Sequence, residues 1–337
     1  MDFRGDLADI IVSSFAECGI SFPENANVDD LVQRYLEMRI RRIEPIPRKV
    51  HFSEEIHDSL GELVRNDDAD QRAQAIEAWG TVFYLNYLFE RGFCVMSFQS
   101  KMSKRKGKVT DTETTDLLLW DYGMHHLHLS RSIDNDGFVR RSDWLLMVIV
   151  SNDDVYFVDV RPHQDAEPKP GHSGPDMTFV RQNLLEIVQA NRPALIESSA
   201  LYGVSGTDIT DREKWELRRK RVNSAPNLGG SAIAPLAGGV AGDGHSVLCT
   251  YLAHRLLHLL DWLQRSLESA FDQLQAEFGN HGLASGAHLD FKLVERQAVN
   301  LVPDDIQMLC SSDSVLDELW NAGFAVIETN TRSVVVF

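Results

Sequence analysis

The segment Trp144-Leu145-Leu146-Met147-Val148-Ile149-Val150 has no polar residue, which is typical of a central strand covered on both faces. A histidine-rich strand is expected before it, at Met124–Ser130. A third strand is expected from Val155 to Arg161, because four residues, 151–154, suit a hairpin connection. We therefore predict a small antiparallel sheet, with a further strand at Phe93–Gln99.

The regions on either side of this sheet predict helices and a short C-terminal sheet. Asn27 is placed to cap a helix from Val28 to Ile43, and residues 68–91 contain a longer helix. We expect the aromatic residues of this longer helix to lie in the core: Trp79, Phe83, Tyr84, Tyr87 and Phe89. The fold class predicted is α+β, with a helical region (1–91), an α+β core (92–222), a Gly-rich flexible linker or loop (223–245) and a long helix with a small sheet (246–337).

The long helix carries one leucine-rich stripe, which predicts either a core face or the seam of a homodimer. Its members are Leu252, Leu256, Leu259, Leu263, Leu267, Phe271 and Leu274. After it we expect a strand near Phe291–Val294, a helix near Ser314–Ala322 and a final strand pair around residues 329–331.

Composition places the chain among globular proteins of the cytoplasm. Its 337 residues are 43% hydrophobic and 25% charged, with no apolar run long enough for a membrane span and no signal-peptide pattern. The four cysteines are far apart in sequence, which predicts neither a disulfide framework nor a zinc ribbon. A formal net charge of −17 argues against a general positive field for nucleic acid.

Polar residues gather at the ends of the predicted central strands, where general acid–base chemistry could take place. Alternate strand residues share a face, so His126 and His128 are expected on one side and His125 on the other. Asp143 precedes the central strand, and Arg161 ends the third strand just before His163. We expect these residues to form a site on an open face of the sheet, because imidazoles titrate near neutral pH and a carboxylate can orient them.

This pattern resembles the RelE superfamily of bacterial toxin endoribonucleases, and its YafQ branch in particular. The resemblance rests on His128, on Asp143 with the adjacent Trp144, and on His163 twenty residues after the aspartate, over about forty residues of the chain. It implies a RelE-like sheet that cleaves mRNA, typically on the ribosome, in a growth-arrest toxin or defence protein. His128, Asp143 and His163 match the catalytic residues of the branch.

The expected reaction needs no metal or cofactor. His128 or His163 would deprotonate the ribose 2′-hydroxyl, and the other imidazole would protonate the leaving oxygen. Phosphate charge would be neutralised by Arg161 or by Arg140 and Arg141. The basic run around Lys104, Arg105 and Lys106 offers a further phosphate contact.

Two other functions are compatible with the same residues. The chain could be a non-catalytic interaction or scaffold protein that reuses such a sheet, which its acidic net charge favours. It could also be a metal-dependent hydrolase in which His126 and His128 bind zinc together with His163 or Asp143. The expected partners are RNA, a protein inhibitor or regulator, and a second copy bound through Leu252–Leu274, with no membrane.

Overall fold

The computed structural model describes residues 1–17, 20–21, 26–65, 68–100, 107–108, 116–162, 178–280, 289–295, 324–328 and 334–335. Its helices and strands confirm the α+β class. The chain divides into two compact units, and both units draw on separated stretches of sequence. Unit 1 is Met1–Leu36, Lys106–Val109 and Cys249–Phe337, and unit 2 is Glu37–Arg105 and Thr110–Leu248. These units cross the boundaries that we expected at residues 91 and 223–245.

Unit 2 is built on a four-stranded sheet with the strand order β2-β6-β5-β4. The predicted antiparallel pairs are confirmed, since β5 (Trp144–Val150) pairs with both β4 (Met124–His128) and β6 (Asp154–Pro162). The strand β2 (Lys49–Phe52) was not predicted, and it pairs in parallel with β6. Its four residues, KVHF, are too few to show a clear strand pattern, so only its pairing with β6 defines it.

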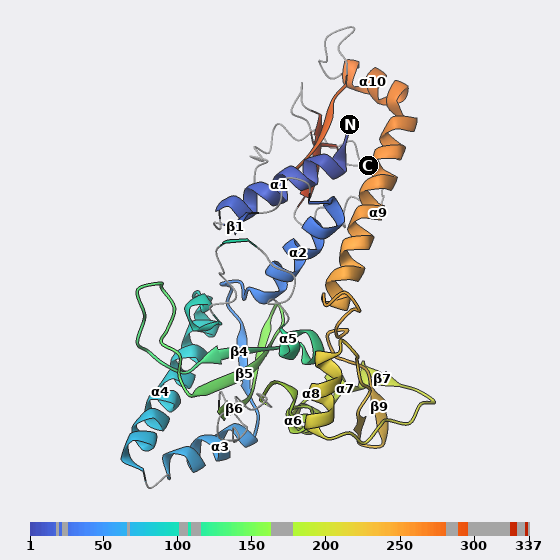
Figure 1. Cartoon of the computed structure of the whole chain (residues 1–337). Coiled ribbons are helices and arrows are strands. Elements are labelled where there is room, and N and C mark those ends of the chain that lie inside the picture. The colour runs from blue at the N-terminus through green and yellow to red at the C-terminus, as the bar shows by residue number, and fades with distance from the viewer. Residues whose placement is uncertain are drawn as a thin grey trace. The chain divides into compact units, whose positions relative to one another are not determined.

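Helices cover both faces of this sheet (Figure 1). On one face, α3 (Glu55–Val64) and α4 (Ala69–Arg91) share a core with Leu127, Leu146 and Phe157. On the other face, α5 (Leu117–Tyr122) and α6 (Gln182–Asn191) share a core with Met124, Met147 and Val158. The prediction that the polar residues lie on an open face of the sheet is therefore wrong, because α5 and α6 cover that face.

A β-bulge alters the alternation of side chains along β6. Met147 lies opposite Asp159 and Val148 lies opposite Phe157, so Val158 has no partner on β5. Val160 consequently lies in the same core as Phe157, although regular alternation would place residues three apart on opposite faces.

The remaining parts of unit 2 include two segments that differ from expectation. The strand predicted at 93–99 is replaced by the 3-10 helix η1 (Met96–Phe98). The Gly-rich segment 223–245, expected as a flexible linker, carries β8 (Asn227–Leu228) and β9 (Ser231–Ile233) of a small sheet ordered β7-β9-β8. The elements not yet named are η3 (Thr178–Val180), α7 (Pro193–Glu197), β7 (Ala200–Leu201) and α8 (Asp211–Arg219).

Unit 1 combines helices with two small sheets. Asn27 caps α2 as predicted, since its side-chain oxygen accepts a hydrogen bond from the Asp30 amide at 2.8 Å. Strand β10 pairs with β11 and β11 with β12, which confirms the strands expected there, while residues 314–322 lie outside the described part. The elements are α1 (Phe3–Glu17), β1 (Ile20–Ser21), α2 (Val28–Arg41), β3 (Gly107–Lys108), α9 (Val247–Ser269), α10 (Phe271–Asn280), β10 (Phe291–Glu295), β11 (Phe324–Glu328) and β12 (Val334–Val335).

The leucine stripe expected on α9 is only partly correct. Leu263 and Leu267 are buried, but in the first half of the helix the buried leucines are Leu257 and Leu260, next to the predicted positions. Leu252, Leu256 and Leu259 are half-buried. No helix in the described ranges is long and apolar enough to cross a membrane.

Candidate functional site

The sheet brings together three of the residues predicted to be catalytic, of which His128 is buried and His126 and Arg161 are half-buried. His128 and Arg161 lie in one cross-strand row, on either side of Leu145, and His126 lies in the next row. The rings of His126 and His128 are 6.1 Å apart, which confirms that they share a face. His128 is only 4% exposed, and the ring of Phe179 lies 5.0 Å from that of His126. A substrate could reach the His128 imidazole only if the groups that bury it moved aside.

Arg161 is paired with Asp159, a residue that we did not assign to the site. An Nη atom of Arg161 lies 2.6 Å from an oxygen of the Asp159 carboxylate, which also accepts hydrogen bonds from the Ser59 hydroxyl and the Val160 amide. Burial raises the pKa of Asp159, and the charge of Arg161 opposes this rise. The arginine thus compensates a buried carboxylate, which is a structural role at the end of β6.

The remaining predicted site residues lie apart from this pair. Asp143 is exposed and forms no ion pair with Arg161 among the residues that the structure describes. Arg140 and Arg141 are exposed, and the only acidic partner of Arg140 within the described part is Asp134 at 3.9 Å. His163, Lys104, Arg105 and Lys106 lie outside the described residues. Across the described ranges, no three His, Cys, Asp or Glu residues come close enough together to hold a metal ion.

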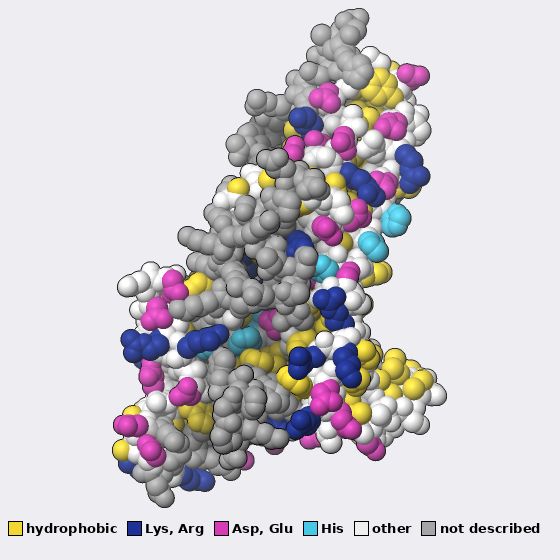
Figure 2. Space-filling model, viewed as in Figure 1, with side chains coloured by type: hydrophobic (Ala, Val, Ile, Leu, Met, Phe, Trp, Pro, Cys, Tyr) yellow, Lys and Arg dark blue, Asp and Glu magenta, His cyan; other side chains and the backbone are white. Residues whose placement is uncertain are grey.

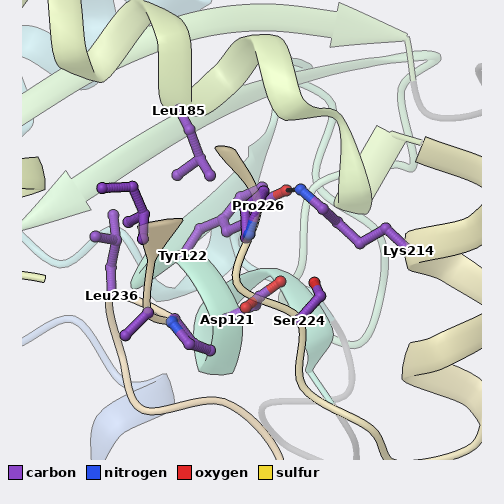
Figure 3. Close-up of a pocket in the computed structure, with 10 residues that line it drawn as sticks. Asp121, Tyr122, Leu185, Lys214, Ser224, Pro226 and Leu236 are labelled. Carbon is purple, nitrogen blue, oxygen red and sulfur yellow. Dashed lines mark hydrogen bonds between the residues drawn. The ribbon is translucent and has the colours of Figure 1, made fainter. Parts of the chain in front are cut away.

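A second polar cluster in unit 2 went unpredicted, and its charged residues, Asp121, Lys214 and Arg218, are buried. Arg218 of α8 pairs with Asp121 of α5, and its other Nη donates to the side-chain oxygen of Asn223 at 2.7 Å. Lys214, 1% exposed, donates from Nζ to the Tyr122 hydroxyl at 2.7 Å (Figure 3). Helical spacing places Lys214 and Arg218 one turn apart on α8, so the sequence shows that both basic side chains lie on one face of this helix. It does not show that Asp121 and Tyr122 of α5 are their partners.

This cluster lines a cavity with room for about one water molecule. Figure 3 shows the Asp121 carboxylate and the Ser224 hydroxyl beside this cavity. Burial lowers the pKa of Lys214 and raises that of Asp121, while the opposite charges of the two groups resist both shifts. The cavity is too small for a substrate, so the cluster joins α5 to α8 and does not form an active site.

The third feature is an exposed aromatic stripe on α4, where we expected core residues. Phe89 is buried as predicted, but Phe83 is 47% exposed, Tyr84 40% and Tyr87 48%. Ile76 and the half-buried Trp79 continue the row toward the start of the helix. We call Ile76, Trp79, Phe83, Tyr84 and Tyr87 the α4 stripe.

Neighbouring side chains hold the rings of the α4 stripe in place. The rings of Trp79 and Phe83 are 6.1 Å apart. The Arg131 guanidinium lies 5.1 Å from the centre of the Tyr84 ring, and Arg91 lies 5.9 Å from that of Tyr87. The sequence contained a sign of this arrangement: α4 has a second apolar row, at 75, 78, 82, 85 and 89, and this other row is the buried one.

On the surface shown in Figure 2, acidic and basic side chains are interspersed among the described residues, without a broad basic field. Comparison of the chain with protein-family models, with curated proteins and with solved structures finds no match. Among the described residues, the α4 stripe is a row of large apolar side chains that neighbouring groups leave accessible.

Proposed function

We propose that this chain is an interaction protein that binds a protein partner through the α4 stripe. The observation that supports the proposal is the exposure of Phe83, Tyr84 and Tyr87 on consecutive turns of one long helix. Contiguous apolar patches rimmed by polar residues mark binding surfaces, and a helix that is apolar on most sides is normally covered. Aromatic residues and arginine are also the residue types that dominate the binding energy of protein interfaces.

The arrangement of the rings favours a protein partner over single-stranded RNA. Binding of RNA by stacking requires open aromatic faces. Here Arg131 lies over the ring of Tyr84, and Arg91 lies over that of Tyr87. A packed helix from another protein needs only the ridge of side chains, which remains exposed.

Site-specific photocrosslinking tests the proposal directly. A benzophenone amino acid would replace Phe83 in one variant and the exposed Ile133, which lies outside α4, in a matched control. We expect a discrete protein adduct in cells from position 83 and none of the same size from position 133. An adduct removed by ribonuclease would identify RNA instead, and no adduct from position 83 would overturn the proposal.

An endoribonuclease of the RelE type remains a second proposal, carried by the resemblance and by one observation. Arg140 and Arg141 are exposed next to the start of β5, beside the exposed Asp143, and the two arginines can contact a phosphate backbone. Incubation of the purified chain with labelled RNA, with and without EDTA, is the test. Cleavage that survives chelation and is lost in His163→Ala and Asp143→Asn would support it, and intact RNA would reject it.

A further inference from the structure

Two oppositely charged residues lie at the two ends of the α4 stripe. Arg72 and Glu90 are both exposed, and neither forms an ion pair within the part of α4 and its surroundings that the structure describes. They are eighteen residues apart, which is five helical turns, so both side chains leave the helix in the same direction. Phe83 lies close to the same line, eleven residues after Arg72 and seven before Glu90.

This spacing makes the stripe complementary to itself when two copies run antiparallel. If the two helices cross at the axial level of residue 81, whose own side chain faces the core, Arg72 of one copy is opposite Glu90 of the other, and the reverse pair forms by symmetry. Trp79 then lies opposite Phe83 of the other copy near the centre. We infer that the partner of the α4 stripe is a second copy of this chain, bound in this antiparallel register. The inference rests on the proposed function and names its partner.

The charges favour this arrangement over the alternatives. A twofold interface uses the same patch on both subunits. Each contact between two different residues therefore occurs twice, once on each side of the twofold axis. The antiparallel register gives two opposite-charge pairs around an apolar centre. A parallel register would place Arg72 against Arg72 and Glu90 against Glu90, and like charges at an interface oppose binding.

Other charged groups near the stripe already have partners. Arg91 stacks on Tyr87, and the Glu77 carboxylate accepts hydrogen bonds from the Ser130 hydroxyl and the Arg131 amide. Among the described residues, Arg72 and Glu90 are charged groups at the ends of the stripe that form no ion pair and can meet a charge on a partner.

Sedimentation of the full chain over a concentration series, together with charge reversal, tests the inference. We expect a dimer for the native chain, and a dimer weakened about tenfold or more in Arg72→Glu and in Glu90→Arg, because each change creates two like-charge pairs. Mixing the two variants should restore the dimer, since the mixed pair recovers both opposite-charge contacts. The double variant R72E/E90R should also dimerise.

Two controls separate this inference from the proposed function. Arg140→Glu changes an exposed arginine outside α4 and should leave the dimer unaffected, while Phe83→Asp should weaken the dimer at least about thirtyfold. A native chain that stays monomeric while position 83 still crosslinks another protein would overturn the self-association and leave the proposed function standing. A dimer that ignores Phe83→Asp, or that mixing the charge variants does not restore, would also reject the register.

Discussion

Polar residues around the central sheet are buried, whereas aromatic residues of α4 are exposed. Each group therefore lies in the environment that its chemistry would disfavour. His128, Asp159 and the Asp121–Arg218 pair are buried, whereas Phe83 and Tyr87 are about half exposed. Both regions belong to unit 2. Each face of a strand or helix could be assigned from periodicity, but whether that face is covered depends on elements that are distant in sequence.

The difference in burial separates the roles of the two regions. Asp159 is paired with Arg161 and Asp121 with Arg218, so these buried charges compensate each other within the fold. The exposed rings of α4 contact neighbouring side chains along one side only, and the rest of their apolar surface is uncovered within the described part of unit 2. The aromatic surface is therefore the region proposed to bind a partner, and the buried polar residues stabilise the fold.

The largest effect on stability is expected from Arg218→Met, which leaves the buried Asp121 carboxylate without its partner. We expect a loss of about 3 to 5 kcal/mol in the free energy of unfolding at neutral pH. The pKa of Asp121 is already raised by burial, and losing Arg218 raises it further. Because a protonated carboxyl needs no counter-charge, the loss should shrink as the pH falls.

Urea unfolding at pH 7 and pH 5 measures this effect, with Arg219→Met as the control on the exposed neighbour. An equal loss in both variants, or a loss that does not depend on pH, would contradict a charge-compensating role for Arg218.

The next largest effect is expected within α4 itself. Leu85 is fully buried, so Leu85→Ala should cost about 2 to 5 kcal/mol, whereas Phe83→Ala should change the free energy of unfolding of the monomer by less than about 1 kcal/mol. Both variants place alanine in the same helix, so helix propensity does not separate them. Thermal unfolding at low protein concentration is the measurement. Similar losses would show that Phe83 belongs to the core.

A smaller effect concerns His125, whose pKa is lowered to about 4 because burial disfavours the imidazolium. The unfolded chain binds a proton near pH 6.5, but the folded chain does not, so stability is lost as the pH falls from 6.5 to about 4. We expect this loss to reach about 1 to 2 kcal/mol at pH 5. His125→Phe should reduce it.

Titration of the His125 imidazole signals by NMR would check this prediction. A measured pKa close to the free value of about 6.5 would mean that this imidazole is solvated.

The smallest effect is expected from Arg140→Met and Arg141→Met, because both side chains are exposed. The free energy of unfolding should change by less than about 0.5 kcal/mol, as is usual for surface substitutions. Thermal unfolding would measure this change. Gel-shift titration with single-stranded RNA would then reveal whether the pair has a separate role. Weaker RNA binding in the double variant would favour the endoribonuclease proposal over the interaction proposal.

Several parts of the fold could be predicted because their signals are local. The unbroken apolar run Trp144–Val150 defined the central strand, the four-residue turn defined its hairpin with β6, and Asn27 defined the start of α2. Strand parity also placed His126 and His128 on one face. These features depend on backbone geometry and on neighbours within a few residues.

Only the tertiary structure decided which faces are covered and which charges meet. Helices α5 and α6 lie over the histidines, β2 joins the sheet from more than a hundred residues before β6, and α8 brings Arg218 to Asp121. The same limit explains α4, where two apolar rows are present and the sequence does not say which one meets the sheet. Burial depends on contacts between distant segments, and a periodic pattern contains no information about the partner of each face.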